Sequence, residues 1–191
     1  EALPETTVAS SFQLYQELGL RGEVNFPAFE QALKGFSRYA SGQDRLLVLI
    51  DYTKPSTEKR FYILDLLQKK LLLSTYVAHG RGSGDNYAVA FSNRPGSYQS
   101  SLGFFRTGDT YMGKNGYSLF LDGLEKGIND KARERAIVVH GANYADPAVL
   151  KGQQRLGRSL GCPALPPDIS KQVIDTIKGG VLLYIYGLNK A

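Results

Sequence analysis

The apolar residues at the start of the chain recur every three or four positions, the spacing of one helix face. A first stripe is followed by helix-ending glycines, and consists of Val8, Phe12, Tyr15 and Leu18, with Gly19 and Gly22 after them. A second stripe has Pro27 in its first turn and Gly42 just past its end, and consists of Phe26, Phe29, Leu33, Phe36 and Ala40. A cofactor box on these aromatic stripes is an alternative, but a packing face is more common. We expect residues 1–43 to form a helical hairpin packed on the rest of the chain.

From residue 44 the pattern changes to short apolar runs, which predict strands. The expected strands cover residues 46–52, 61–66, 71–78, 103–106, 117–121 and 136–140, with a turn at Gln68-Lys69-Lys70. Glycine and serine dominate residues 80–103, which favours loops with short strands. An amphipathic helix from Pro167 to Ile177 then closes at Gly179-Gly180, and a buried strand follows at 181–186. Helices at both ends predict an α+β fold with a mainly β core over residues 44–191.

The composition mainly excludes classes of protein and partner. The 191 residues suit one domain, and 42% hydrophobic with 21% charged residues is ordinary for a globular protein. The net charge of +5 comes from scattered basic residues, so we expect no nucleic-acid partner. We also expect a monomer. No run approaches the ~20 apolar residues of a membrane span. Because the chain begins at Glu1, we expect that a leader has been removed; a membrane link would need an anchor lost with it.

One cysteine and two histidines supply all thiol and imidazole chemistry. A single cysteine excludes an intramolecular disulfide and any zinc motif with two thiolates. Cys162 ends the segment Gly157-Arg158-Ser159-Leu160-Gly161-Cys162 and precedes Pro163, a setting that favours a sharp turn exposing the sulfur. A lone cysteine is often a small buried hydrophobe. The nearby arginine and hydroxyl favour a reactive thiolate instead.

The two histidines lie in similar surroundings but suggest different roles. His140 ends the apolar run 136–139 and precedes Gly141, so it can project from a strand end as the general base for Cys162. A buried core histidine is the alternative. His79 precedes a glycine-rich stretch that fails the dinucleotide fingerprint, because Asp85 replaces the third glycine. We expect a loop bordering the site there, with His79 as a candidate substrate contact.

A zinc site is the remaining reading of these residues. His79, His140 and Cys162 could form a Cys-His-His centre with an open position. Neither a His-Glu-x-x-His motif nor an obvious acidic base accompanies them. We therefore expect no metal and no cofactor.

The combination of His140-Gly141 with Ser159-x-Gly161-Cys162 resembles the signature of the YkuD-type L,D-transpeptidases. The segment Asn93-Arg94-Pro95-Gly96-Ser97-Tyr98 looks like a variant of that family's Thr-Pro-x-Gly-x-Phe entry. The similarity is closest to the murein L,D-transpeptidase catalytic-domain branch, over residues 44–187, and the hairpin at 1–43 resembles the leading segment of that branch. The resemblance implies a β-rich catalytic domain at 44–191 without a cofactor.

The resemblance also implies roles for residues already singled out. Cys162 is the nucleophile, His140 is base and then acid, and the Gly141 backbone carbonyl orients the imidazole. The N–H groups of Gly161 and Cys162 form an oxyanion hole, and Ser159 supports the loop.

Substrate contacts follow less directly. Tyr111 and Tyr117 are expected to line the cleft, with core or rim packing an equal alternative. The wider family has arginine two residues after the cysteine, where this chain has Ala164. Arg158 is the candidate substitute for recognising a donor carboxylate.

The implied substrates are peptidoglycan stem peptides, and the implied location is extracytoplasmic, in the periplasm or cell envelope. Cys162 would take an acyl group from a tetrapeptide stem and pass it to an amine, giving a 3→3 cross-link, and it would be acylated by carbapenems. Two alternatives stay open: an L,D-carboxypeptidase or related amide hydrolase with water as acceptor, and a cell-wall binding module without turnover.

Overall fold

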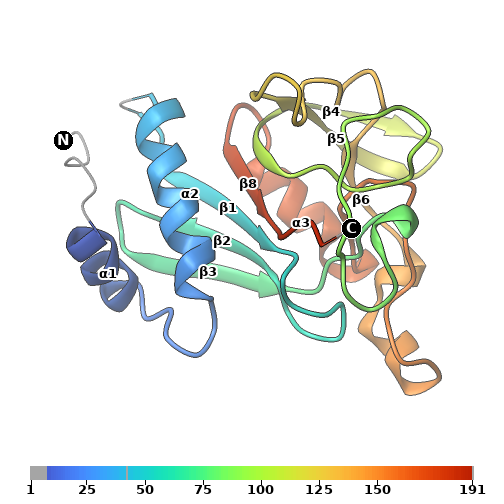
Figure 1. The fold of residues 1–191 in the computed structure, drawn as a ribbon, viewed down its shortest axis with the longest axis horizontal. Helices are drawn as coiled ribbons and strands as arrows, with labels where there is room; N and C mark the ends of the chain where they lie inside the picture. Colours follow the sequence, from blue (N-terminus) through green and yellow to red (C-terminus); the bar gives the residue numbers. More distant parts are fainter. Residues whose placement is uncertain (1–7, 42, 191) are drawn as a thin grey trace.

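A single eight-stranded sheet organises the computed structural model, which describes residues 8–41 and 43–190 (Figure 1). Residues 1–7 and Gly42 of the predicted hairpin, and residue 191, lie outside the described part. The sheet order is β3-β2-β1-β8-β4-β5-β6-β7, with β1–β8 and β6–β7 parallel and the other pairs antiparallel. The strands are β1 Leu46–Asp51, β2 Phe61–Asp65, β3 Lys70–Thr75, β4 Gly103–Gly113, β5 Gly116–Gly123, β6 Val138–Gly141, β7 Ala164–Leu165 and β8 Leu182–Tyr186.

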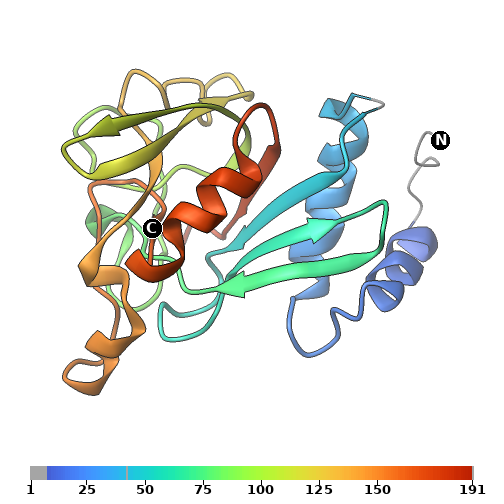
Figure 2. The ribbon, with the colours of Figure 1, turned by 180° about the vertical axis from the view of Figure 1, so that it is seen from behind.

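The predicted helices are present and lie on opposite faces of the sheet. Helices α1 Val8–Glu17 and α2 Phe26–Tyr39 contact each other, and α2 contacts β1 and β8. Helix α3 Pro167–Ile177 packs against β5 and β6. Figures 1 and 2 show α2 and α3 on opposite sides of the strands. The α+β prediction with a mainly β core is confirmed. Within the described residues, no helix combines the length and apolarity that a membrane crossing requires.

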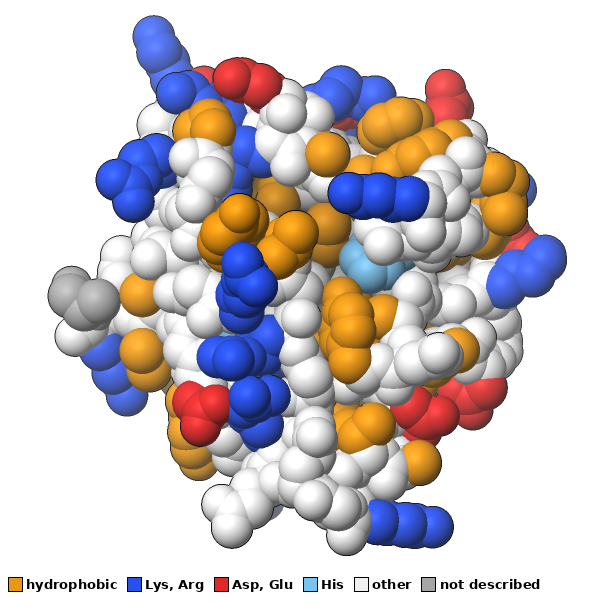
Figure 3. Space-filling model, turned by 90° about the vertical axis from the view of Figure 1, so that its right-hand side faces the viewer, with side chains coloured by type: hydrophobic (Ala, Val, Ile, Leu, Met, Phe, Trp, Pro, Cys, Tyr) orange, Lys and Arg blue, Asp and Glu red, His pale blue; other side chains and the backbone are white. Residues whose placement is uncertain are grey.

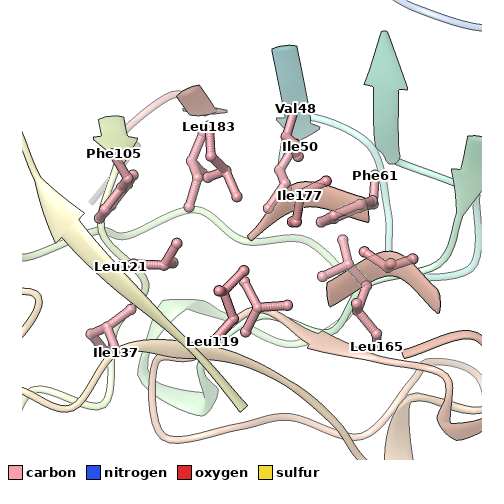
Figure 4. Packing of buried hydrophobic residues seen from close by; sticks show 14 of the residues in the cluster. Val48, Ile50, Phe61, Phe105, Leu119, Leu121, Ile137, Leu165, Ile177 and Leu183 are labelled. Atoms are coloured by element: carbon pink, nitrogen blue, oxygen red, sulfur yellow. The ribbon is translucent and has the colours of Figure 1, made fainter. Parts of the chain in front are cut away.

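Strand β1 is buried on both faces, which explains its unbroken apolar run. Leu47 and Leu49 pack with α1 and α2, whereas Val48 and Ile50 belong to the cluster on the other face. That second cluster reaches from β1 to the site side of the molecule and includes Phe105, Leu119, Ile137, Leu165, Ile177 and Leu183 (Figure 4). The elements that carry the site are therefore fixed by the main core.

Several strands differ from their predicted bounds: β3 ends at Thr75 instead of residue 78, and β5 covers Gly116–Gly123 instead of 117–121. Strands β4 and β6 differ for reasons that an apolar pattern cannot show. Strand β4 extends seven residues past Arg106, because its polar second half pairs with β5 as a partly exposed hairpin. Strand β6 begins at Val138 instead of residue 136. Ala136 has a left-handed backbone (φ 54°) and the Ile137 N–H donates to the Ala132 carbonyl, so both residues end a turn.

The glycine-rich region 80–103 is a loop, as predicted, but the expected short strands are wrong. Within these described residues there is one 3-10 turn, η1 Arg81–Ser83, with isolated bridges from Gly80 to Ser159 and from Gly84 to Ala88. Two further 3-10 turns, η2 Asn143–Ala145 and η3 Pro147–Lys151, precede the Cys162 loop. Strand β7 was not predicted; it is the short segment that returns beside His140.

Candidate active site

His140 lies at the carboxyl end of β6, paired with Ser118 of β5 on one side and Ala164 of β7 on the other. Its imidazole is buried, and Nδ1 lies 2.9 Å from the Gly141 carbonyl oxygen. A carbonyl can only accept, so Nδ1 carries the proton and Nε2 keeps its lone pair. Burial lowers the pKa of His140, and the hydrogen bond to Gly141 opposes this only in part. The ring is thus a neutral base of defined tautomer.

Cys162 lies on the loop that enters β7, with its sulfur against the start of β6 and the turn that precedes it. Its Sγ accepts from the Val138 N–H at 3.4 Å and donates to the Ala136 carbonyl at 3.4 Å. Burial raises the pKa of the Cys162 thiol, while the Val138 N–H and the charges of Arg135 and Lys114 oppose this rise. The group rests as a thiol whose ionisation nearby donors and cations assist.

Ser159 closes the turn that carries Cys162. Its hydroxyl donates to the Cys162 carbonyl at 2.6 Å and accepts from the Gly161 N–H at 3.1 Å. Gly161 has φ +129°, and a Cβ there would lie 2.8 Å from Ile137 Cδ1. The turn therefore requires glycine at this position.

The Gly161 N–H donates to the Ser159 hydroxyl, so this predicted oxyanion donor points into the loop. The Cys162 N–H has no hydrogen-bond partner among residues 8–41 and 43–190. Of the two predicted donors, only Cys162 presents a free N–H in this arrangement.

Cys162 and His140 open into one cavity of about 400 Å³. The lining includes the predicted residues Ser159, Arg158 and Tyr111, together with Lys114, Arg135 and Tyr144. Figure 3 shows this side of the molecule, with imidazole surface at the bottom of a hollow framed by apolar side chains, and a line of basic side chains beside it. In the described chain no hydrogen bond joins the two side chains, because the thiol faces the Ala136 carbonyl.

A second cavity of about 460 Å³ lies next to the first, and Lys114, Asn115 and Tyr144 line both. Tyr117 and Gly141 line the second cavity only. The Tyr117 hydroxyl donates to Asp175 of α3 at 2.6 Å. Tyr117 therefore does not share the cavity of the Cys162 thiol.

A family model of the L,D-transpeptidase catalytic domain matches residues 20–186. The chain belongs to this family. A search among curated proteins finds no match.

Three solved structures are similar to this chain at low sequence identity. The cell shape determining protein Pgp2 (K307A mutant) from Campylobacter jejuni is 16% identical with a TM-score of 0.50, over 78% of this chain and 49% of that one. The L,D-transpeptidase from Mycobacterium smegmatis is 13% identical with a TM-score of 0.45, over 75% of this chain and 59% of that one. The one from Stackebrandtia nassauensis is 15% identical with a TM-score of 0.45, over 95% and 78%. This chain thus spans about half to three fifths of the first two proteins.

In this L,D-transpeptidase domain His79 lies beneath the site instead of facing a substrate. Its side chain is 1% exposed and lines neither cavity described above. Nδ1 accepts from the Arg60 guanidinium at 2.9 Å, and Nε2 lies 3.4 Å from the Gly84 carbonyl. Burial, and then the charge of Arg60, lower the pKa of His79 to about 3. The predicted substrate contact is corrected to a buried neutral imidazole.

Three charged or aromatic residues that line the cavity of Cys162 were not predicted. Arg135 holds the loop 92–101 through the Ser92 and Gln99 carbonyls at 2.8 and 2.7 Å. Lys114 stands at the tip of the β4–β5 hairpin, and Tyr144 lies in η2. The one sequence feature connected with these three residues is the glycine at position 157, since a Cβ there would collide with the Tyr144 side chain. Within the described residues, no group of three or more His, Cys, Asp or Glu side chains could hold a metal ion.

Proposed function

We propose that this domain is a peptidoglycan L,D-transpeptidase acting outside the cytoplasm. Cys162 attacks the carbonyl of the L-centred third residue of a tetrapeptide stem, the bond to the terminal D-Ala breaks, and a thioester forms. The side-chain amine of a second stem then displaces the thiol, which gives a 3→3 cross-link. What carries this proposal is one observation: the only cysteine of the chain shares a cavity with an imidazole whose Nδ1 is bound by the Gly141 carbonyl.

His140 moves the protons of both half-reactions. Its neutral Nε2 takes the thiol proton during attack and delivers it to the nitrogen of the departing D-Ala. In the second half-reaction the same Nε2 takes a proton from the attacking amine and returns it to the departing Cys162 thiolate. The thiol must first turn from the Ala136 carbonyl towards the ring. Catalytic hydrogen bonds often tighten only when a substrate is bound.

The developing oxyanion is stabilised chiefly by the Cys162 N–H. The Gly161 N–H contributes only if it leaves the Ser159 hydroxyl. Ser159 acts by holding the turn, since both of its hydroxyl contacts are within residues 159–162.

Arg158 is proposed to bind a carboxylate of the donor stem. It lines the cavity, and its Nη1 donates to the Gly84 carbonyl at 3.1 Å, which fixes the guanidinium. Arg155 lies three residues earlier, pairs with Asp85 and does not line the cavity. Arg158→Gln is expected to weaken donor binding, seen as a higher KM, whereas Arg155→Gln leaves it unchanged.

The deciding experiment combines intact-protein mass with product analysis. Incubation with tetrapeptide-bearing muropeptides should give dimers with loss of D-Ala, and a carbapenem should add its mass to Cys162. Cys162→Ala should abolish both. Shortened monomers without dimers would show that the acyl-enzyme is hydrolysed and not transferred to an amine. Undiminished turnover in Cys162→Ala would show that Cys162 is not the nucleophile. Binding of muropeptides without any product would support a binding module.

A further inference from the structure

The turn that carries Cys162 is attached at both ends to one neighbouring segment, residues 78–81. Before the cysteine, the Ser159 N–H donates to the His79 carbonyl at 2.9 Å and the Arg81 N–H donates to the Ser159 carbonyl at 2.8 Å. After it, Ala78 and Ala164 exchange hydrogen bonds at 2.8 and 3.3 Å. Any shift of segment 78–81 therefore moves both ends of the Cys162 turn together.

Arg60 holds this segment from the inside of the molecule. Its side chain is fully buried, and Nε and Nη2 donate to the Val77 carbonyl at 3.0 and 2.7 Å. Nη2 also donates to His79 Nδ1 at 2.9 Å, and Nη1 donates to the Lys54 carbonyl at 3.0 Å. One guanidinium thus binds Val77, the residue just before the segment, and the His79 ring within it.

The His79 ring is suited to be the fixed partner of this guanidinium. Arginine has no acceptor, so Nδ1 must be unprotonated and Nε2–H must face the Gly84 carbonyl. A pKa of about 3 keeps the ring neutral at physiological pH. The tautomer and both contacts are therefore determined by Arg60.

Burying a guanidinium lowers the free energy of unfolding, so stability alone does not account for Arg60. No carboxylate hydrogen-bonds to Arg60 in the described chain; the Tyr52 ring lies 4.8 Å from Cζ, and the buried Asp51 carboxylate acts on the guanidinium only through its charge. Burying a charge without a hydrogen-bonded ionic partner opposes folding, and apolar side chains of similar size often replace buried ionic groups without loss of stability. What an apolar side chain could not supply is the set of directed bonds to Val77 and His79.

We propose that Arg60 and His79 form a positioning pair that sets the Cys162 turn relative to His140. The inference rests on the proposed function and adds a new level to it: neither residue touches the reacting atoms, and both act through the backbone of residues 77–81. The alternative is that the pair contributes to stability alone.

The primary test compares His79→Leu with His79→Asn. Asparagine places Oδ1 at the same distance from Cβ as Nδ1, so it can still accept from Arg60, whereas leucine cannot. Carbapenem acylation of Cys162 is measured at saturating reagent, below the unfolding transition of every variant. We expect His79→Leu to lower the limiting rate by roughly 10- to 100-fold, as a displacement near 1 Å does. His79→Asn should restore most of it, with the half-saturating concentration little changed in both.

Arg60→Lys and Arg60→Met extend the test, with Arg106→Met as matched control. Arg106 also donates to backbone carbonyls, of Tyr39 and Gly180, and pairs with Asp44 at 3.3 Å. In the described chain none of these three partners hydrogen-bonds to residues 77–81. We expect Cys162 to be acylated slowly in both Arg60 variants, since lysine keeps the charge but loses the several fixed N–H donors of the guanidinium. In folded Arg106→Met we expect acylation at the parent rate. Equal limiting rates for folded His79→Leu and the parent would overturn the inference.

Failure of the proposed function gives a different result. If the parent protein is not acylated at all, the proposed chemistry fails, and the pair is judged by amide hydrogen exchange at Ser159 and Arg81. Faster exchange there in His79→Leu, absent in His79→Asn and in Arg106→Met, supports positioning of the turn. Unchanged exchange refutes it.

Discussion

The Cys162 sulfur is held in a setting that opposes its ionisation. Burial raises its pKa above the ordinary 9.0, and Lys114 is one of the charges that counteract this. Because the thiolate is the reactive species, alkylation by iodoacetamide should accelerate through pH 9 without levelling off below it. Lys114→Ala should raise the pKa further and slow alkylation at each pH between 7 and 9. The rate is measured by intact mass, since the chain has one cysteine.

Lys126→Ala is the control for this experiment, because Lys126 is exposed and lines neither cavity described above. It should leave the profile unchanged. A plateau near pH 6 would instead indicate a resting thiolate paired with a protonated His140, contrary to the raised thiol pKa and the lowered imidazole pKa.

Gly161 offers a second test at the same scale. Alanine there would adopt a strained backbone at φ +129° and meet Ile137 Cδ1 at 2.8 Å and the Gln99 carbonyl at 3.1 Å. We expect Gly161→Ala to slow acylation of Cys162 by roughly 100-fold, because the turn must shift. Gly152→Ala, at a position with open space and an ordinary φ, should acylate at the parent rate. Comparable rates for the two variants would show that the turn tolerates a side chain.

At the scale of elements, the sequence was informative where one pattern determined the structure. Strand β1 was found because burial on both faces demands an unbroken apolar run. The second half of β4 was not, because its polar residues are stabilised by pairing with β5. The Cys162 turn and His140 were recognisable because each lies in a short motif with glycine.

The parts of the site that escaped prediction depend on contacts between distant segments. Arg135 reaches the cavity only because loop 92–101 folds over it. The prediction of His79 as a substrate contact was wrong because its neighbouring glycines suggested exposure. Its ring is instead buried and hydrogen-bonded to Arg60, 19 residues earlier. No local pattern encodes such partners.

Helix α2 provides an element-scale prediction. Gly35 is buried, and a Cβ there would overlap the ring of Phe104 in β4, which stacks on Tyr184. Helix propensity alone would make Gly35→Ala stabilising by about 1 kcal/mol. We expect instead a loss of about 1–3 kcal/mol in the free energy of unfolding, measured in urea, from overpacking. Adding Phe104→Leu should relieve part of the loss; a more stable Gly35→Ala variant would contradict this docking of α2.

At the scale of the whole molecule, both histidines make folding stability depend on pH in the same direction. Burial lowers the pKa of each, so between the folded and unfolded pKa the unfolded chain binds more protons. Stability is therefore complete above the unfolded value of 6.5 and falls as the solution becomes more acidic. For His79 the fall continues to its folded pKa of about 3.

The comparison of the parent protein with His79→Asn isolates one of these two groups. His140 titrates in both, and so do the carboxylates, so the difference between the two free energies of unfolding reports His79. From pH 5.5 to 4.5 we expect the parent to lose about 1.4 kcal/mol relative to the variant, the value for one proton per pH unit. Urea unfolding at half-unit intervals measures it. Parallel curves would mean that His79 titrates normally in the folded state, and that Arg60 does not hold it neutral.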